Sequence, residues 1–405
     1  MRPVFTNFVF LNKIFLYGLL IRILIMPFFA HPDIFWINLG PSNITNNVFN
    51  IYEFHGDNKN IHLFKYPPLA YFFLAAQHII FKPFISDFDF FKDDIHSYNY
   101  WFDSPNIFQN LFVLKIFYLL ADIFILFFCV KISDDNDNIK KNIIKFWAFS
   151  PFVFYATYMY AQFDILPTAF VFLAFYFFYK ARLCSAFFCL GIASALKHFP
   201  FILLPFFLIL IDRPLKYRLL YFLLCLLPYL IFLPFYISSP SFLDDVIFNS
   251  SSYITKSKIF MFGYFIILAL CLFFKRNRQN INILIAYSFI VLSLYLISVR
   301  EFNPQFILWI TPFFYLFAAK NKIAKYLYFL LIPVYFIYIT YLGVNSTNKI
   351  LIPLNNDLTA LPSINSIISH IFKINYDKII FISKWLFNFL LLIFFFIKVD
   401  VNENN

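Results

Sequence analysis

The chain has 405 residues and a formal net charge of +11; 62% of its residues are hydrophobic, 24% are aromatic and only 13% are charged. A soluble fold of this size keeps much of its surface in water and cannot bury so many apolar side chains. The composition therefore excludes a soluble enzyme, a nucleic-acid-binding domain and a disordered chain. It predicts an all-α polytopic membrane protein, in which residues 1–405 form a single integral domain without a soluble domain.

Apolar runs separated by charged clusters predict about twelve spans, since each span needs about 20 apolar residues. The first run has no small-residue cleavage site, so we expect a retained span and not a signal peptide. The runs 183–196 and 199–211 are short. They are either true spans or half-helices that meet at 197–200. In chain order the runs are 8–30, 107–130, 146–160, 163–180, 183–196, 199–211, 217–236, 259–274, 281–298, 304–319, 323–342 and 378–397.

Basic residues gather in alternate loops, and the positive-inside rule places these loops and both termini in the cytoplasm. The charge of +11 is then an orientation signal and not a footprint for nucleic acid. In this topology residues 31–106 form one outer loop, and the apolar run 69–84 is a re-entrant or interfacial segment within it. The alternative, in which 69–84 spans the membrane, would move the later basic loops outside.

Polar residues at the outer ends of the spans are the next signal. Asp33 directly follows the first span, where a carboxylate backed by apolar walls is partly desolvated and suits a general base. The alternative is an ordinary interfacial acid. Glu53 and Tyr66 follow in the same loop, and Tyr66 precedes two prolines that would give a rigid start to the next segment. The alternative is that the tyrosines and prolines of these segments are only interfacial anchors.

Polar residues later in the chain also lie at the outer ends of predicted spans. Gln162 and Asp164 lie in a very short outer turn, where they are either tightly positioned ligands or ordinary turn residues. Lys197 and His198 interrupt an apolar stretch on the outer side, where orientation rules give no reason for a cation, and a lysine there suits a lipid phosphate.

Arg300 and Glu301 belong to a short polar segment between two spans. The arginine either pairs with Glu301 or binds a phosphate through two hydrogen bonds. Lys115 and Asp122 stand two helical turns apart in one span, which predicts an internal pair or polar contacts inside the bundle. Carboxylates and cations at one membrane face predict a lipid-anchored phosphate ligand and acid–base chemistry. An ion channel or proton pump would instead carry charges in series at mid-span.

These residues, in this order, resemble the GT-C superfamily of polytopic glycosyltransferases, in particular its GPI-mannosyltransferase-like and polyprenyl-phosphate-sugar-dependent members. The resemblance covers about two thirds of the chain, and the sequence departs from many relatives at Tyr160 and Ala161 and in having no second acid beside Asp33. The matching residues are Asp33, Tyr52, Glu53, Tyr66, Pro67, Pro68, Leu69, Lys115, Asp122, Ser150, Pro151, Gln162, Phe163, Asp164, Gly191, Lys197, Pro200, Arg300, Glu301, Gln305 and Trp309.

The resemblance implies an inverting hexosyltransferase that takes mannose or another hexose from a polyprenyl- or dolichyl-phosphate donor to a glycan, lipid or protein acceptor at the outer or luminal face. Asp33 would be the catalytic base, and Lys197, His198 and Arg300 would hold the donor phosphate. The sugar or acceptor would contact Gln162, Asp164, Glu53, Tyr66 and Glu301.

Two other classes stay open: a flippase or transporter of lipid-linked sugars, and a membrane scaffold without chemistry. No cofactor is expected, and nothing in the sequence supports a divalent metal, although one is not excluded. We expect a prokaryotic plasma membrane, with the endoplasmic reticulum as the alternative. Three N-glycosylation sequons, at Asn43, Asn249 and Asn345, all fall in predicted outer loops.

Overall fold

A computed structural model of the chain describes residues 12–53, 66–85, 97–133, 136–248, 257–274, 280–299, 303–339, 348–362, 364–373 and 375–397. Within these ranges every regular element is a helix and no strand occurs. The predicted all-α class is therefore confirmed. Helices suit this composition because they satisfy their backbone hydrogen bonds internally and need no water to do so.

The helices of the first half alternate between long apolar segments and short pieces. In chain order they are α2 (Lys13–Ile25), α3 (Asp33–Thr45), α5 (Pro68–Phe81), η1 (Lys82–Phe84), α6 (Ser97–Phe102), α7 (Ile107–Leu114), α8 (Ile116–Ile132), α9 (Asp137–Ala148), α10 (Pro151–Val153), the π-helix η3 (Phe154–Met159), α11 (Ile165–Tyr179), α12 (Leu183–Leu196), η4 (Phe199–Leu203) and α13 (Leu204–Leu210).

The second half continues the same pattern. Its helices are α14 (Leu215–Leu230), α15 (Leu233–Tyr236), α16 (Pro240–Phe242), η5 (Leu243–Phe248), α18 (Lys258–Phe273), α19 (Ile281–Ser298), η6 (Pro304–Trp309), α20 (Thr311–Lys320), α21 (Lys322–Ile339), η7 (Asn348–Leu351), η8 (Asn356–Ala360), α22 (Ile364–Phe372) and α23 (Tyr376–Phe395).

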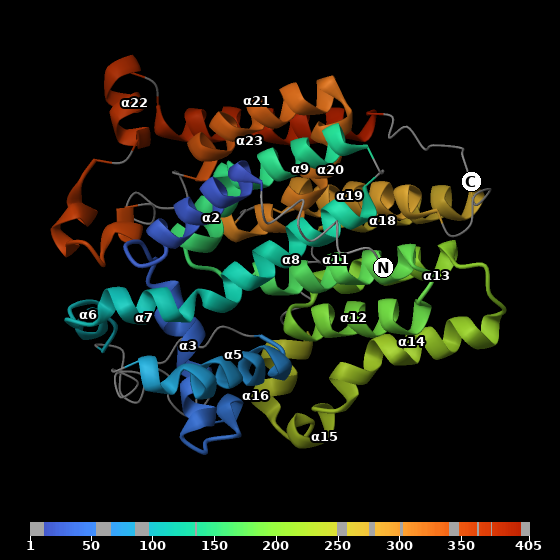
Figure 1. Ribbon diagram of the computed structural model, residues 1–405, viewed down its shortest axis with the longest axis horizontal. Coiled ribbons are helices and arrows are strands. Elements are labelled where there is room, and N and C mark those ends of the chain that lie inside the picture. The colour runs from blue at the N-terminus through green and yellow to red at the C-terminus, as the bar shows by residue number, and fades with distance from the viewer. Residues whose placement is uncertain are drawn as a thin grey trace.

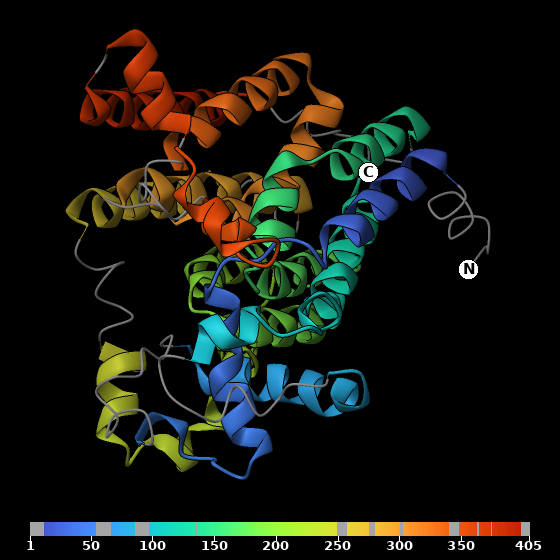
Figure 2. The same cartoon turned by 90° about the vertical axis from the view of Figure 1, so that its left-hand side faces the viewer.

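Most of the long helices lie side by side along the long axis of the molecule (Figure 1). The α3 helix runs across this direction at one end of the bundle, next to α5 and near α7 (Figure 1). The same end, seen face-on in Figure 2, also carries the segment 348–362. The first turn of α3 therefore lies at the same end of the bundle as the segments that join the long helices there.

Four helical segments are long and apolar enough to cross a membrane: Ile107–Ile132, Ile281–Ser298, Lys322–Ile339 and Asp377–Phe395. Several outward-facing helices also expose large apolar side chains, such as Phe262 at 73% and Trp385 at 62%. A surface of this kind suits lipid and not water. The protein is thus an integral membrane protein. The shorter apolar helices in the described part of the chain have 10–17 residues, so the count of twelve spans stays a prediction.

The two segments of uncertain topology both form helices. Residues 69–84 lie mostly in α5, which packs against α3, α7 and α12; its position relative to the membrane stays a prediction. The α12 helix ends where Lys197 takes an extended conformation (φ −157°, ψ 141°), and η4 begins two residues later. The predicted break at 197–200 is therefore present, and it places Lys197 between two short apolar helices.

A buried ion pair joins several helices inside the bundle. Arg22 Nε donates to Asp122 Oδ2 at 2.6 Å, and both side chains are almost completely buried. Trp147 Nε1 and the Tyr158 hydroxyl also donate to this carboxylate, at 2.7 and 2.9 Å. Four helices, α2, α8, α9 and η3, are joined in this way. Of the two predicted alternatives, the internal Lys115–Asp122 pair is not formed, because Asp122 pairs with Arg22. The other alternative, polar contacts inside the bundle, is found.

Helices α12 and α14 pack closely at a glycine. A Cβ atom added at Gly191 would lie 2.2 Å from the carbonyl oxygen of Cys225. We expect Gly191→Ala to separate the two helices and to lower the free energy of unfolding by about 1–3 kcal/mol, the usual cost of overpacking. The thermal midpoint in detergent measures this loss.

The matched control is Gly263→Ala. A Cβ atom there would meet only the end of the flexible Leu294 side chain, at 2.7 Å, and that side chain can rotate away. Its thermal midpoint should stay close to that of the wild type. Equal midpoints for the two variants would contradict a close α12–α14 contact.

Candidate functional site

Asp33 begins α3 at the end of the bundle described above. Its Oδ2 atom accepts a hydrogen bond of 2.7 Å from Gln162 Nε2, and its Oδ1 atom lies 3.0 Å from His31 Nδ1. The imidazole of His31 stacks on the ring of Tyr160, with centroids 4.2 Å apart. The Asp33 side chain remains 21% exposed. The carboxylate is thus oriented by two neighbours and still accessible.

The turn that carries Gln162 has an unusual backbone. It follows the π-helix η3, and π-helical turns occur often at functional sites. Ala161 then adopts φ 60°, in the left-handed region that side chains other than glycine, asparagine and aspartate rarely take. The N–H of Gln162 donates to the Ala156 carbonyl at 3.1 Å. This geometry turns the buried Gln162 side chain toward Asp33.

Asp164 lies two residues further along and is fully buried. Its Oδ1 atom accepts hydrogen bonds from Lys197 Nζ at 2.8 Å and from Trp309 Nε1 at 2.7 Å, and its Oδ2 atom accepts from Lys197 Nζ at 2.7 Å. These bonds compensate for the removal of a carboxylate from water. Because its oxygen atoms are occupied in this way, Asp164 orients Lys197 and does not present an open face to a sugar.

Aromatic rings surround the Lys197 ammonium. Its Nζ atom lies 5.3 Å from the ring centroid of Tyr66 and 5.9 Å from that of Trp309. Phe163 and Phe306 complete the cage, at 5.4 and 5.7 Å. Rings at this distance attract a cation. Sequence reasoning missed Phe306, because one phenylalanine among 65 carries no signal by itself.

Lys197 keeps capacity for a ligand. Two of its contacts go to Asp164, and its side chain is 14% exposed. An ammonium has three donors, so one has no acceptor among the residues that the structure describes. Two buried atoms near Asp33 are also without a hydrogen-bond partner within that part of the chain, His31 Nε2 and Gln162 Oε1. Each of these two atoms can take part in a hydrogen bond with a ligand.

The remaining predicted residues are placed unequally. Glu53 accepts a hydrogen bond from the Ser239 hydroxyl, which links the segment after α3 to the start of α16. His198 is half-buried and stacks on Tyr229 with centroids 5.9 Å apart. Desolvation, followed by the charge of Lys197, lowers the pKa of His198 to about 4. The ring is therefore neutral at pH 7 and can offer one N–H donor to a ligand. Arg300 and Glu301 lie outside the described residues.

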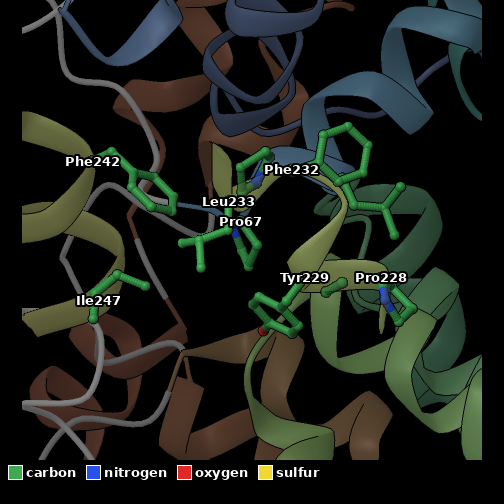
Figure 3. Close-up of a pocket in the computed structure, with 10 residues that line it drawn as sticks. Pro67, Pro228, Tyr229, Phe232, Leu233, Phe242 and Ile247 are labelled. Carbon is green, nitrogen blue, oxygen red and sulfur yellow. The ribbon is translucent and has the colours of Figure 1, made fainter. Parts of the chain in front are cut away.

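Figure 3 shows a small apolar pocket. Its wall is near the Lys197 cage in sequence, since Pro67 directly follows Tyr66 and Ala195 lies two residues before Lys197; Tyr229 in the wall also stacks on His198. Its lining is almost entirely apolar. The lining residues are Pro67, Pro68, Leu69, Ala195, Pro228, Tyr229, Phe232, Leu233, Phe242 and Ile247.

Comparison of the chain with protein-family models, with curated proteins and with solved structures found no match. The family resemblance thus rests on the residues named above and stays a prediction. Across the part of the chain that the structure describes, no three His, Cys, Asp or Glu side chains cluster as metal ligands would. The prediction about cofactors is not tested by this finding.

Replacement of Lys197 by methionine tests the role of the ion pair. The change leaves the Asp164 carboxylate buried without its cation, and we expect a loss of about 3 kcal/mol in the free energy of unfolding. The double variant Lys197→Met/Asp164→Asn removes both charges and should recover most of this loss. Thermal midpoints in detergent report both changes. A double variant no more stable than Lys197→Met would contradict the pairing.

Proposed function

We propose that the chain is a membrane glycosyltransferase that moves a hexose from a polyprenyl- or dolichyl-phosphate donor to an acceptor hydroxyl. One observation carries the proposal: residues of a single short turn contact both an accessible carboxylate and a caged ammonium. Gln162 orients Asp33, and Asp164, two residues away, orients Lys197. The Cα atoms of these two turn residues can be at most about 7 Å apart.

The cationic side of the site suits the donor. The remaining N–H of Lys197 can bind a phosphate oxygen, and neutral His198 can add one hydrogen bond. We also assign Arg300 to the phosphate, from its place in the sequence. The lipid chain would then lie along the apolar pocket (Figure 3). As the sugar leaves, negative charge grows on the phosphate, and a fixed cation stabilises it.

The acidic side suits the acceptor. Asp33 takes the proton of the acceptor hydroxyl as its oxygen attacks the anomeric carbon. The new C–O bond forms as the bond from that carbon to the phosphate oxygen breaks, and the configuration inverts. His31 Nε2 and Gln162 Oε1, which lack partners among the described residues, can bind hydroxyl groups of either substrate. Tyr66, Glu53 and Glu301 stay assigned to sugar or acceptor binding.

The topology of the proposal follows the charge pattern. Both termini would lie in the cytoplasm and the site at the outer or luminal face. A prokaryotic plasma membrane is favoured, with the endoplasmic reticulum as the alternative. The acceptor would be a glycan, a lipid or a protein.

Substitution of Asp33 by asparagine tests the catalytic base. The amide has nearly the same shape but cannot accept the proton, so kcat should fall at least about 100-fold while donor affinity changes little. Transfer from defined polyprenyl-phosphate sugars and donor binding are measured on the same preparation. Asp357→Asn, an exposed acid in η8, serves as the control.

The outcome separates the alternatives. Full transfer activity in Asp33→Asn would overturn the assignment of the base. Transport of a lipid-linked sugar without transfer, retained in the variant, would instead favour a flippase. A chain that neither transfers nor transports sugars, in which Asp33, Lys197 and Arg300 can be replaced without a phenotype, would be a scaffold.

A larger side chain in the pocket tests where the lipid binds. Leu233→Trp narrows the pocket, so we expect the KM for a long-chain donor to rise about tenfold, a change of about 1.4 kcal/mol in binding. The KM for a short, water-soluble donor analogue should change little. Leu230→Trp, at a position that is 46% exposed and outside the pocket, is the control. Equal effects on both donors would place the lipid elsewhere.

A further inference from the structure

The ammonium of Lys115 is buried at the junction of α7 and α8 and is completely inaccessible to solvent. Its Nζ atom donates to the carbonyl oxygens of Met26 at 2.7 Å and Tyr158 at 2.9 Å, and also to that of Phe29. Within the described part of the chain it forms no ion pair with a carboxylate. All three of its donors are therefore used on backbone oxygen atoms.

These carbonyl groups belong to the two segments that build the candidate site. Phe29 lies four residues before Asp33, and Tyr158 lies four residues before Gln162. The segments meet again beyond the lysine, where Gln162 Nε2 donates to Asp33 Oδ2 at 2.7 Å. The Lys115 ammonium thus joins the two segments just before the point where Asp33 and Gln162 touch.

Neither segment can replace this donor easily. The Met26 carbonyl ends α2, and the N–H of Ala30 is turned away from it toward the Ile350 carbonyl, at 3.1 Å. Tyr158 is held at two points, because its hydroxyl donates to Asp122 while its carbonyl accepts from Lys115. Without the ammonium, the carbonyl groups would lose hydrogen bonds in a place that water does not reach, which is unfavourable.

We propose that Lys115 is a positioning residue, which holds the segments before Asp33 and Gln162 together so that these two side chains stay in contact. Its effect on activity rests on the proposed glycosyl transfer, whereas its effect on the backbone does not. Lys115 itself touches neither substrate in this assignment. Methionine at this position keeps the length of the side chain and removes the three donors.

The first measurement is amide hydrogen exchange of the whole protein in lipid nanodiscs. In Lys115→Met we expect exchange at 27–34 and 157–162 to accelerate at least about tenfold, because both segments can then open locally. Phe207→Ala is the control for general destabilisation, since its ring packs in another part of the bundle, against Phe175, Phe178 and Phe187. If Lys115→Met does not fold, Lys115→Arg, which keeps the charge with a different geometry, is measured in its place.

The second measurement is a double-mutant cycle on transfer activity. Gln162→Ala should lower kcat about 100-fold in the wild-type background, since a misplaced base costs about this much. In the Lys115→Met background the same change should have less than about a twofold further effect, because the contact is already lost. A merely structural lysine would leave the cost of Gln162→Ala equal in both backgrounds.

The outcomes are distinguishable. Unchanged exchange in both segments, or exchange that accelerates equally in Phe207→Ala, overturns the positioning role whatever the activity. Faster exchange confined to both segments supports it even if the wild-type protein transfers no sugar, in which case only the proposed function fails. An equal cost of Gln162→Ala in both backgrounds also overturns it.

Discussion

The buried carboxylate of Asp164 is the interaction on which the arrangement of the site depends. An ionised group in an apolar bundle is tolerated only when charged or polar donors surround it. Those donors are Lys197, which follows α12, and Trp309, which ends η6, so one side chain at the start of α11 holds three parts of the bundle together. The extended backbone at Lys197 and the π-helix before the turn lie directly beside this convergence.

The buried charges divide into two groups with different consequences. Arg22, Asp122 and Lys115 are buried, and their hydrogen bonds go to groups of the protein, so they are not accessible to a ligand. Asp33 and Lys197 are partly exposed, and each keeps hydrogen-bonding capacity. Charges are costly in a membrane protein wherever they lie. Unused hydrogen-bonding capacity, more than charge itself, distinguishes the proposed reacting groups from the residues that position them.

Much of the site could be predicted because the costs of burial act on single residues. Asp33, Gln162, Asp164 and Lys197 were each identified as polar groups at the end of an apolar run, and the structure brings the four together. The predicted contact of Asp164 with a sugar does not follow from the geometry, since its oxygen atoms are occupied. Its partner Trp309 is 145 residues away, and no local pattern predicts which donor a buried carboxylate will find.

The sequence by itself determined the all-helical class, the membrane environment and the few polar positions at the ends of its apolar runs, because composition and hydropathy act residue by residue. Only the tertiary structure decided the partners. It paired Asp122 with Arg22 and directed Lys115 to three backbone carbonyl groups, where spacing along one helix had also allowed a Lys115–Asp122 pair. The physical reason is that a side-chain ammonium can donate to a carboxylate or to carbonyl oxygens, and packing fixes which of them it reaches.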